Sequence, residues 1–191
     1  DGDGWIGVYH HWDSYPTALG RSLWHLGRKW GLTPMLMTLI DEHPAGWSTI
    51  NDADWELNPG FNELRGTPSD TPTRPQCYCH GDRAETAQAV THADDAGIEW
   101  VYVFDETADT MAVIERIYNG SHGVGMFGFG PTVDGKPQWA LRGVIAMTAD
   151  EPNWDVLRHG ICDCGSGLAA TKWNDKAERA VCQRCQDLTT I

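Results

Sequence analysis

The chain lacks a long apolar run, because its longest mainly apolar stretch is the short segment from Met35 to Ile40. A helix that crosses a bilayer needs about 20 apolar residues, so a membrane-spanning helix is not expected. The glycine-rich stretch at 120–130 has no helical pattern directly after it, which argues against a phosphate-binding loop. The chain also contains no internal repeat.

Basic residues are scarce: 14 lysines and arginines stand against 27 aspartates and glutamates, which gives a formal net charge of −13. The acidic excess lies in residues 1–158, because acidic and basic side chains balance in residues 159–191. An acidic body repels phosphate groups, so binding to duplex nucleic acid or to anionic lipid is not expected. Basic proteins and cations are compatible partners, although an acidic surface often serves solubility alone.

Large apolar side chains are plentiful, with 41% hydrophobic residues and ten tryptophans among 191 residues. Such a chain can offset the entropy lost on folding, so a globular body is expected. Periodicity and turn residues predict strands at 5–12, 100–104, 111–117 and 139–147, and helices at 17–30, from Thr33 to before Pro44, and from Asp150 to about Arg158. This order predicts an α+β fold, in which a mainly antiparallel sheet has helices on one face and a small zinc ribbon follows at the C-terminal end.

Four of the six cysteines form two close pairs near the C-terminal end. One residue separates Cys162 from Cys164, two separate Cys182 from Cys185, and 17 residues lie between the pairs. Neighbouring cysteines are poor disulfide partners for each other, whereas two thiolate pairs supply the four tetrahedral ligands of a structural zinc ion. The sequence therefore predicts one Zn²⁺ in a module of residues 159–191, which follows an acidic α+β domain of residues 1–158.

The one-residue spacing of the first cysteine pair departs from the commoner two-residue spacing. Redox-active cysteines, disulfides or another metal such as iron are therefore alternatives to zinc. Because thiolate ligands persist in a reducing compartment, the predicted location is the cytoplasm.

Two clusters of polar residues are candidates for catalysis. The first contains His10, His11, Asp13 and Tyr15, and the second contains His80, Asp82 and Arg83. If folding joined them, a histidine would act as a base, an aspartate would orient it, and the guanidinium would stabilise an anion. Adjacent strand residues point to opposite faces, so at most one of the two adjacent histidines would share a face with the tyrosine. The alternative is that both histidines are interior or edge residues and that the first aspartate caps the turn before the first helix.

The second cluster also permits a metal site. Cys77, Cys79 and His80 carry suitable ligand atoms, and His43 or His92 would supply a fourth. A one-residue cysteine pair without a partner pair is a weaker signal than two pairs.

Two segments resemble known sequences. The stretch Gly7-Val-Tyr-His-His-Trp-Asp-Ser-Tyr-Pro16, with the later Cys79-His-Gly-Asp-Arg83, resembles uncharacterised proteins of bacteriophages and actinobacteria that carry a His-Trp-Asp-x-Tyr-Pro segment. The tail from Cys162 to Cys185 is similar to small zinc ribbons of the same kinds of genome. The resemblance implies an origin, in a bacterial or phage-infected cell, and a two-part architecture, but no activity.

Three functions are compatible with these features. The first is a phage-type or actinobacterial accessory or regulatory protein that binds another macromolecule, a protein by preference, through its acidic body and zinc ribbon. The second is a small hydrolase of a nucleotide-like or phosphorylated substrate that uses the two polar clusters. The third is an acidic mimic of DNA. The sequence leaves open whether the protein is an enzyme, and also its oligomeric state.

Overall fold

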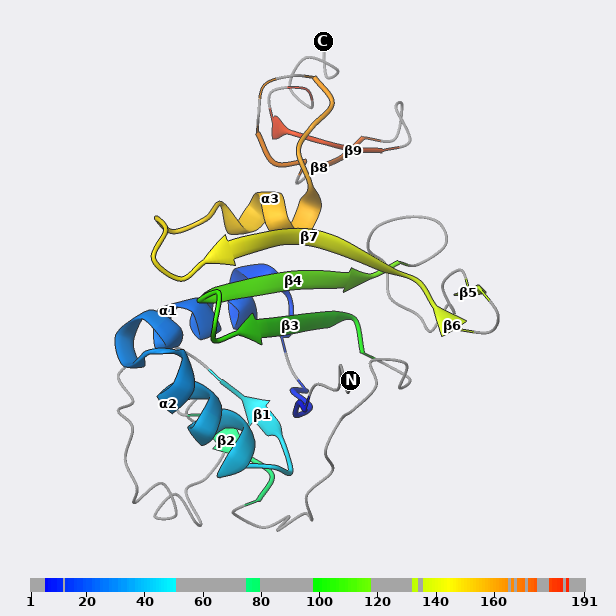
Figure 1. The fold of residues 1–191 in the computed structure, drawn as a ribbon. Coiled ribbons are helices and arrows are strands. Elements are labelled where there is room, and N and C mark those ends of the chain that lie inside the picture. Colours follow the sequence, from blue (N-terminus) through cyan, green and yellow to red (C-terminus); the bar gives the residue numbers. More distant parts are fainter. Residues whose placement is uncertain are drawn as a thin grey trace.

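The computed structural model describes residues 6–11, 13–50, 75–79, 98–117, 132–133, 136–164, 166, 168–170, 172–174, 179–183 and 185. Its main body has an α+β fold in which helices pack against an antiparallel three-stranded sheet, as the sequence predicts. Figure 1 shows α3 (Trp154–His159) beside the last strand of this sheet, and a small C-terminal module beyond α3. The expectation of an α+β body followed by a small cysteine-containing module is confirmed.

The central sheet contains β3 (Trp100–Asp105), β4 (Thr110–Arg116) and β7 (Trp139–Ala146), in the order β3-β4-β7. The β3–β4 hairpin has an uninterrupted register, and the carboxylate of Asp105 accepts hydrogen bonds from two backbone N–H groups of the turn. Such an Asx turn is locally encoded, which explains why the hairpin could be predicted from sequence. Strand β3 forms one edge of the sheet.

The predicted N-terminal helices are present in divided form. A π-helical turn η1 (Pro16–Gly20) leads into α1 (Arg21–Trp30), and α2 (Leu32–Leu36) continues into a second π-helical turn, η2 (Met37–Asp41). Gly31, at φ +87°, ends the helical conformation between α1 and α2, where the sequence predicts a break between two helices. The predicted helix start at Thr33 is one residue late, because α2 begins at Leu32, and the Thr33 hydroxyl donates a hydrogen bond to Glu106 (2.6 Å).

The last helix of the main body is shorter than the sequence suggests. Helix α3 begins at Trp154, because the side chain of Asn153 caps it by accepting a hydrogen bond from the Val156 N–H. The predicted start at Asp150 is therefore wrong by one turn. The helix ends at His159, and Gly160 follows at φ +77°.

The predicted strand at 5–12 is not a regular strand within the described residues. The segment 6–11 is extended and forms a parallel bridge between His10 and Trp47, the first residue of β1 (Trp47–Thr49). Strand β1 pairs in turn with β2 (Gln76–Cys77). Figure 1 places β1, β2 and α2 on the β3 side of the sheet, opposite α3.

Two separate groups of buried side chains support these parts. The larger joins the helices to the inner face of the sheet and includes Leu26, Met35, Trp47, Met111, Val113 and Ile145. The smaller lies in the C-terminal module and contains Cys162, Ala170, Val181 and Cys182. These groups lie on either side of Gly160 in the sequence, and the domain boundary after residue 158 stays a prediction.

Two short hairpins complete the described structure. Strand β5 (Thr132–Val133) pairs with β6 (Lys136–Pro137), and β8 (Lys172–Asn174) pairs with β9 (Arg179–Val181) in the C-terminal module. None of the described helices has the length and apolar character needed to cross a membrane.

Candidate metal centre and edge groove

The C-terminal cysteines converge at one point. The thiol sulfurs of Cys162, Cys164, Cys182 and Cys185 all lie within 4.8 Å of one another. The Sγ–Sγ distances are 3.9 Å between Cys162 and Cys185 and 3.7 Å between Cys164 and Cys182. Ligands at about 2.3 Å from a tetrahedral metal are about 3.8 Å apart. The four sulfurs are therefore spaced as a metal site requires.

Short backbone pairings hold the first cysteine pair in place. The N–H of Cys162 donates to the carbonyl of Leu168 (2.9 Å), and the N–H of Ala170 donates to the carbonyl of Gly160 (3.0 Å). These bonds close a loop that carries Cys164 on its exposed side. The second pair directly follows β9, whose last residue is buried.

The electrostatics of the cluster favour a cation. Hydrogen bonds with the Ser166 hydroxyl and backbone lower the pKa of the Cys164 thiol to about 6, and the Ser166 oxygen lies 3.0 Å from that sulfur. The neighbouring Cys164 raises the pKa of Cys185 to about 12. The shifts are opposite because thiolates this close repel each other, and a metal cation bound between the four sulfurs would relieve this repulsion.

A second group of ligand atoms lies near β1 and β2. His43, Cys77 and Cys79 place their ligand atoms within 4.8 Å of one another. The sequence suggested these two cysteines together with His80 and either His43 or His92, and the structure places His43 beside both cysteines. Residues His80 and His92 lie outside the described residues.

The first candidate catalytic residue, His10, is held by hydrogen bonds on both ring nitrogens. Its Nε2 accepts from the Ile50 backbone N–H (3.2 Å), so the ring proton resides on Nδ1 and is donated to Ser14 Oγ (3.0 Å). The Ser14 hydroxyl in turn donates to the carbonyl of His10 (3.2 Å). Burial lowers the pKa of His10 to about 4. This arrangement is that of a neutral interior histidine.

The other residues of the first cluster point in different directions. His11 is exposed, and its Nδ1 lies 3.3 Å from the Tyr9 hydroxyl. Asp13 is exposed at φ +54°. The ring of Tyr15 packs against the Arg158 guanidinium at 3.8 Å. The second cluster, His80, Asp82 and Arg83, lies outside the described residues, so a joint catalytic site stays a prediction.

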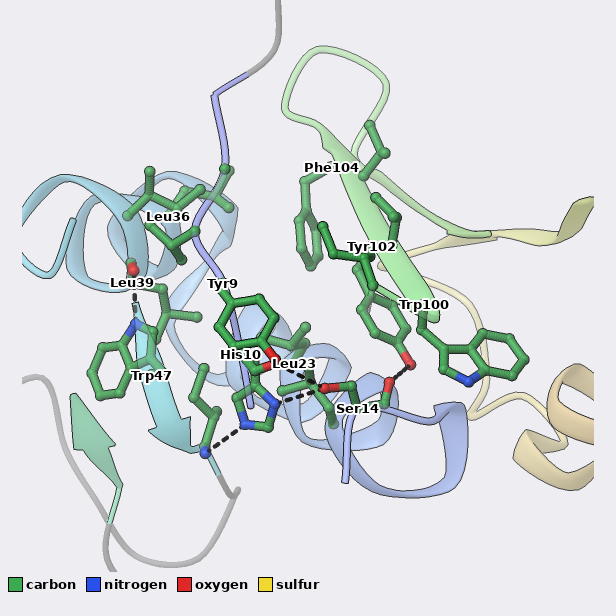
Figure 2. A pocket seen from close by; sticks show the side chains of 18 of the residues that line it. Tyr9, His10, Ser14, Leu23, Leu36, Leu39, Trp47, Trp100, Tyr102 and Phe104 are labelled. Carbon is green, nitrogen blue, oxygen red and sulfur yellow. Dashed lines mark hydrogen bonds between the residues drawn. The ribbon is translucent and has the colours of Figure 1, made fainter. Parts of the chain in front are cut away.

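A feature that the sequence did not reveal is a cavity of about 700 Å³ between the edge strand β3 and the N-terminal segment. We call it the edge groove: residues 98–104 form one wall and residues 6–11 the other. Figure 2 shows Tyr102 and Phe104 of β3 on one side of the cavity and Leu39 of η2 and Trp47 of β1 on the other, with Tyr9 and His10 between them. Because the wall includes consecutive residues of β3, the groove follows the edge of the strand.

The groove is apolar at its floor and acidic at its rim. The floor carries Leu19, Leu23, Leu36, Leu39 and Trp47. The rim carries four exposed carboxylates, of Asp13, Asp41, Glu99 and Glu106, and the described lining contains no lysine or arginine. A sequence signal for the wall exists in the aromatic alternation of residues 100, 102 and 104, but it does not reveal which edge of the strand is open.

Comparisons with known proteins return nothing similar: no family model, no curated protein and no solved structure matches the chain. The likeness to phage and actinobacterial sequences therefore stays a prediction.

Proposed function

We propose that this protein is a non-enzymatic accessory or regulatory protein that binds an extended, basic and apolar segment of a partner protein in the edge groove. We further propose that its C-terminal cysteines hold one structural zinc ion. The observation that carries the binding proposal is the edge of β3 that pairs with none of the described strands, and that faces an extended segment across an apolar groove with an acidic rim.

The backbone of β3 supports the proposal. The Arg116 N–H donates to the carbonyl of Glu99 (2.8 Å), which establishes which residues bond to β4. Bonded residues alternate along an antiparallel strand, so the backbone groups of Trp100, Tyr102 and Phe104 point away from β4. Among the described strands, none pairs with this edge. An exposed edge of this kind is a template for an added strand.

The opposite wall is also extended. The Trp47 N–H donates to the carbonyl of Tyr9 (2.8 Å), and the His11 N–H donates to the carbonyl of Trp47 (3.0 Å). By the same alternation, the backbone of Val8 and the N–H of His10 point away from β1. A strand in the groove would therefore lie between segment 6–11 and β3, and would join the β1–β2 pair to the central sheet.

The lining indicates the composition of the partner. Alternate side chains of an added strand would face the leucines and tryptophan of the floor, which favours apolar residues at every second position. The remaining side chains and the ends of the strand would approach four carboxylates without a competing cation in the described lining. Lysine and arginine at these places would gain complementary charge and faster association.

The zinc proposal rests on the donor set. Four thiolates in tetrahedral spacing are the ligand set of structural zinc, and they leave no open position for chemistry. The described core of the module contains only two non-cysteine residues, Ala170 and Val181. Metal binding would therefore supply much of its folding free energy, on the order of 10 kcal/mol.

The binding proposal is tested with a fluorescent eight-residue peptide that alternates valine and lysine. We expect saturable binding by fluorescence anisotropy, and much weaker binding of a peptide with glutamate in place of lysine. The decisive comparison uses peptides N-methylated at every second residue, which removes the backbone donors of one strand edge. Two such peptides are compared, one for each edge of the strand. If both methylated peptides bind as tightly as the unmethylated peptide, no strand is added to β3.

Variants of the rim test the location of the peptide. Glu99→Gln or Asp41→Asn should each weaken binding about two- to five-fold at low salt, as expected for an exposed charge pair. The matched control is Asp155→Asn, because Asp155 is also exposed but belongs to α3 and does not line the groove. Equal losses in all three variants would place the peptide elsewhere.

Elemental analysis tests the zinc proposal. Cys182→Ser removes a buried ligand and should abolish one equivalent of zinc per chain. The control His11→Ala changes an exposed residue outside the cluster and should leave the zinc content unchanged. Retention of all zinc by Cys182→Ser would contradict the assignment.

The two remaining hypotheses stay predictions. The hydrolase requires residues 80–83, which lie outside the described part of the chain, and the engaged nitrogens of His10 do not favour a basic role. The DNA mimic requires rows of carboxylates at phosphate-like spacing, whereas the four rim carboxylates border a groove.

A further inference from the structure

We propose that His43, Cys77 and Cys79 form a second zinc site, distinct from the four-cysteine centre and independent of the groove proposal. Their ligand atoms lie within 4.8 Å of one another, although His43 is separated from both cysteines by more than 30 residues of sequence. Two thiolates and an imidazole are a nitrogen and sulfur donor set that suits zinc.

The fold builds this site from two segments joined by backbone hydrogen bonds. The first is a turn closed by the Gly46 N–H, which donates to the carbonyl of His43 (3.0 Å). The second segment is attached to it, since the Tyr78 N–H donates to the carbonyl of Gly46 (2.9 Å) and Cys77 pairs with Trp47. The site is therefore positioned by the main chain rather than by flexible side chains.

Glycine is required at position 46 for this approach. Gly46 has φ +88°, and a Cβ atom there would lie 2.4 Å from the carbonyl oxygen of Tyr9. Only a residue without a side chain lets the turn that carries His43 pack so closely on the N-terminal segment.

The surroundings of the ligands are those of a metal site. His43 is only 2% exposed, and its ring packs edge-on against Trp47 with 4.8 Å between ring centroids. The backbone N–H of Ala45 donates to the sulfur of Cys79 (3.2 Å). Such donors stabilise a thiolate and orient it toward a cation. A buried imidazole beside two half-buried thiols thus has both ligand chemistry and support.

Three described ligands leave one position of a tetrahedral ion for water or for a further residue. The metal would join the turn at residues 43–46 to the segment at 75–79. Because Trp47 also bonds to Tyr9 and His11, this joint supports the N-terminal segment.

The test measures zinc content by elemental analysis after purification of the full chain without chelator. We expect two equivalents per wild-type chain. A double variant, Cys162→Ser with Cys182→Ser, should retain one equivalent, because it destroys only the four-cysteine centre. Cys79→Ser should also retain one equivalent, and circular dichroism checks that its helices are intact.

The outcomes separate the two sites. One equivalent in the wild type and none in the double variant would overturn the second site and leave the first. Two equivalents in Cys79→Ser would overturn it as well. If Cys79→Ser fails to fold, the double variant and a cobalt(II) titration of the wild type still test the second site. We expect two cobalt equivalents with thiolate charge-transfer absorption. A single equivalent would contradict the proposal.

Discussion

Acidification should destabilise this protein, because the partly buried ring of His10 resists protonation in the folded state. Burial lowers the pKa of His10 to about 4, although the carboxylate of Asp13 opposes the shift. An unfolded histidine has a pKa of about 6.5. Between these two values the unfolded chain binds a proton that the folded protein does not. The free energy of unfolding must therefore fall as the pH falls through this window.

The size of the effect follows from the difference in pKa. A shift of one pKa unit corresponds to about 1.4 kcal/mol, so His10 should remove about 3 kcal/mol of stability between pH 7 and pH 4. Above pH 7 the folded and unfolded states both hold a neutral ring, and the effect vanishes. At pH 7 the hydrogen bonds to Ser14 and Ile50 stabilise the folded protein, because they hold the neutral His10 ring and contribute about 1 kcal/mol each.

The assay compares urea unfolding of the wild type and His10→Gln at pH 7 and pH 4. Other titrating groups, including the cysteine thiols, contribute alike to both proteins and cancel in the difference. The wild type should be more stable at pH 7 and should lose about 3 kcal/mol relative to the variant by pH 4. His11→Gln, an exposed neighbour, should change stability at pH 7 by less than about 0.5 kcal/mol.

An NMR titration of the His10 ring provides the direct check. A midpoint near 4 supports the interior role, whereas a midpoint above 6 would refute the reasoning and would restore His10 as a candidate base. A stability difference that stays constant from pH 7 to pH 4 would refute it equally.

Three further predictions concern packing and metal. Gly46→Ala should lower the free energy of unfolding by at least about 2 kcal/mol more than Gly160→Ala. The reason is that a Cβ at position 46 would meet the Tyr9 carbonyl, whereas a Cβ at position 160 would have no atom within 4 Å. Equal losses in thermal melts would show that the backbone at Tyr9 moves aside at little cost. Tyr102→Phe should cost about 1 kcal/mol by removing the bond from its buried hydroxyl to the Ser14 carbonyl (2.7 Å), and urea unfolding measures it. Chelation of zinc should unfold the four-cysteine module, which amide hydrogen exchange would report as lost protection in residues 160–185; unchanged protection would contradict a structural metal.

The hairpin of β3 and β4 illustrates what could be predicted from sequence. Its strands carry the apolar runs 100–104 and 111–114, and the Asp105 side chain accepts hydrogen bonds from the turn between them. The four-cysteine cluster could be predicted for a similar reason, because two short pairs constrain the distances between their sulfurs before any tertiary contact forms. The boundaries of α2 and α3 were predicted less well, because caps depend on single side chains such as Asn153.

The sequence by itself determined the acidic character of the chain, the α+β class, the β3–β4 hairpin and the position of the C-terminal cysteines. Only the tertiary structure decided that His43 approaches Cys77 and Cys79, that His10 is held on both nitrogens, and that one edge of β3 borders a groove. Local spacing constrains residues a few positions apart. Contacts across 30 or more residues depend instead on which apolar faces are buried together and on close approaches such as that of Gly46 to Tyr9, which no local pattern records.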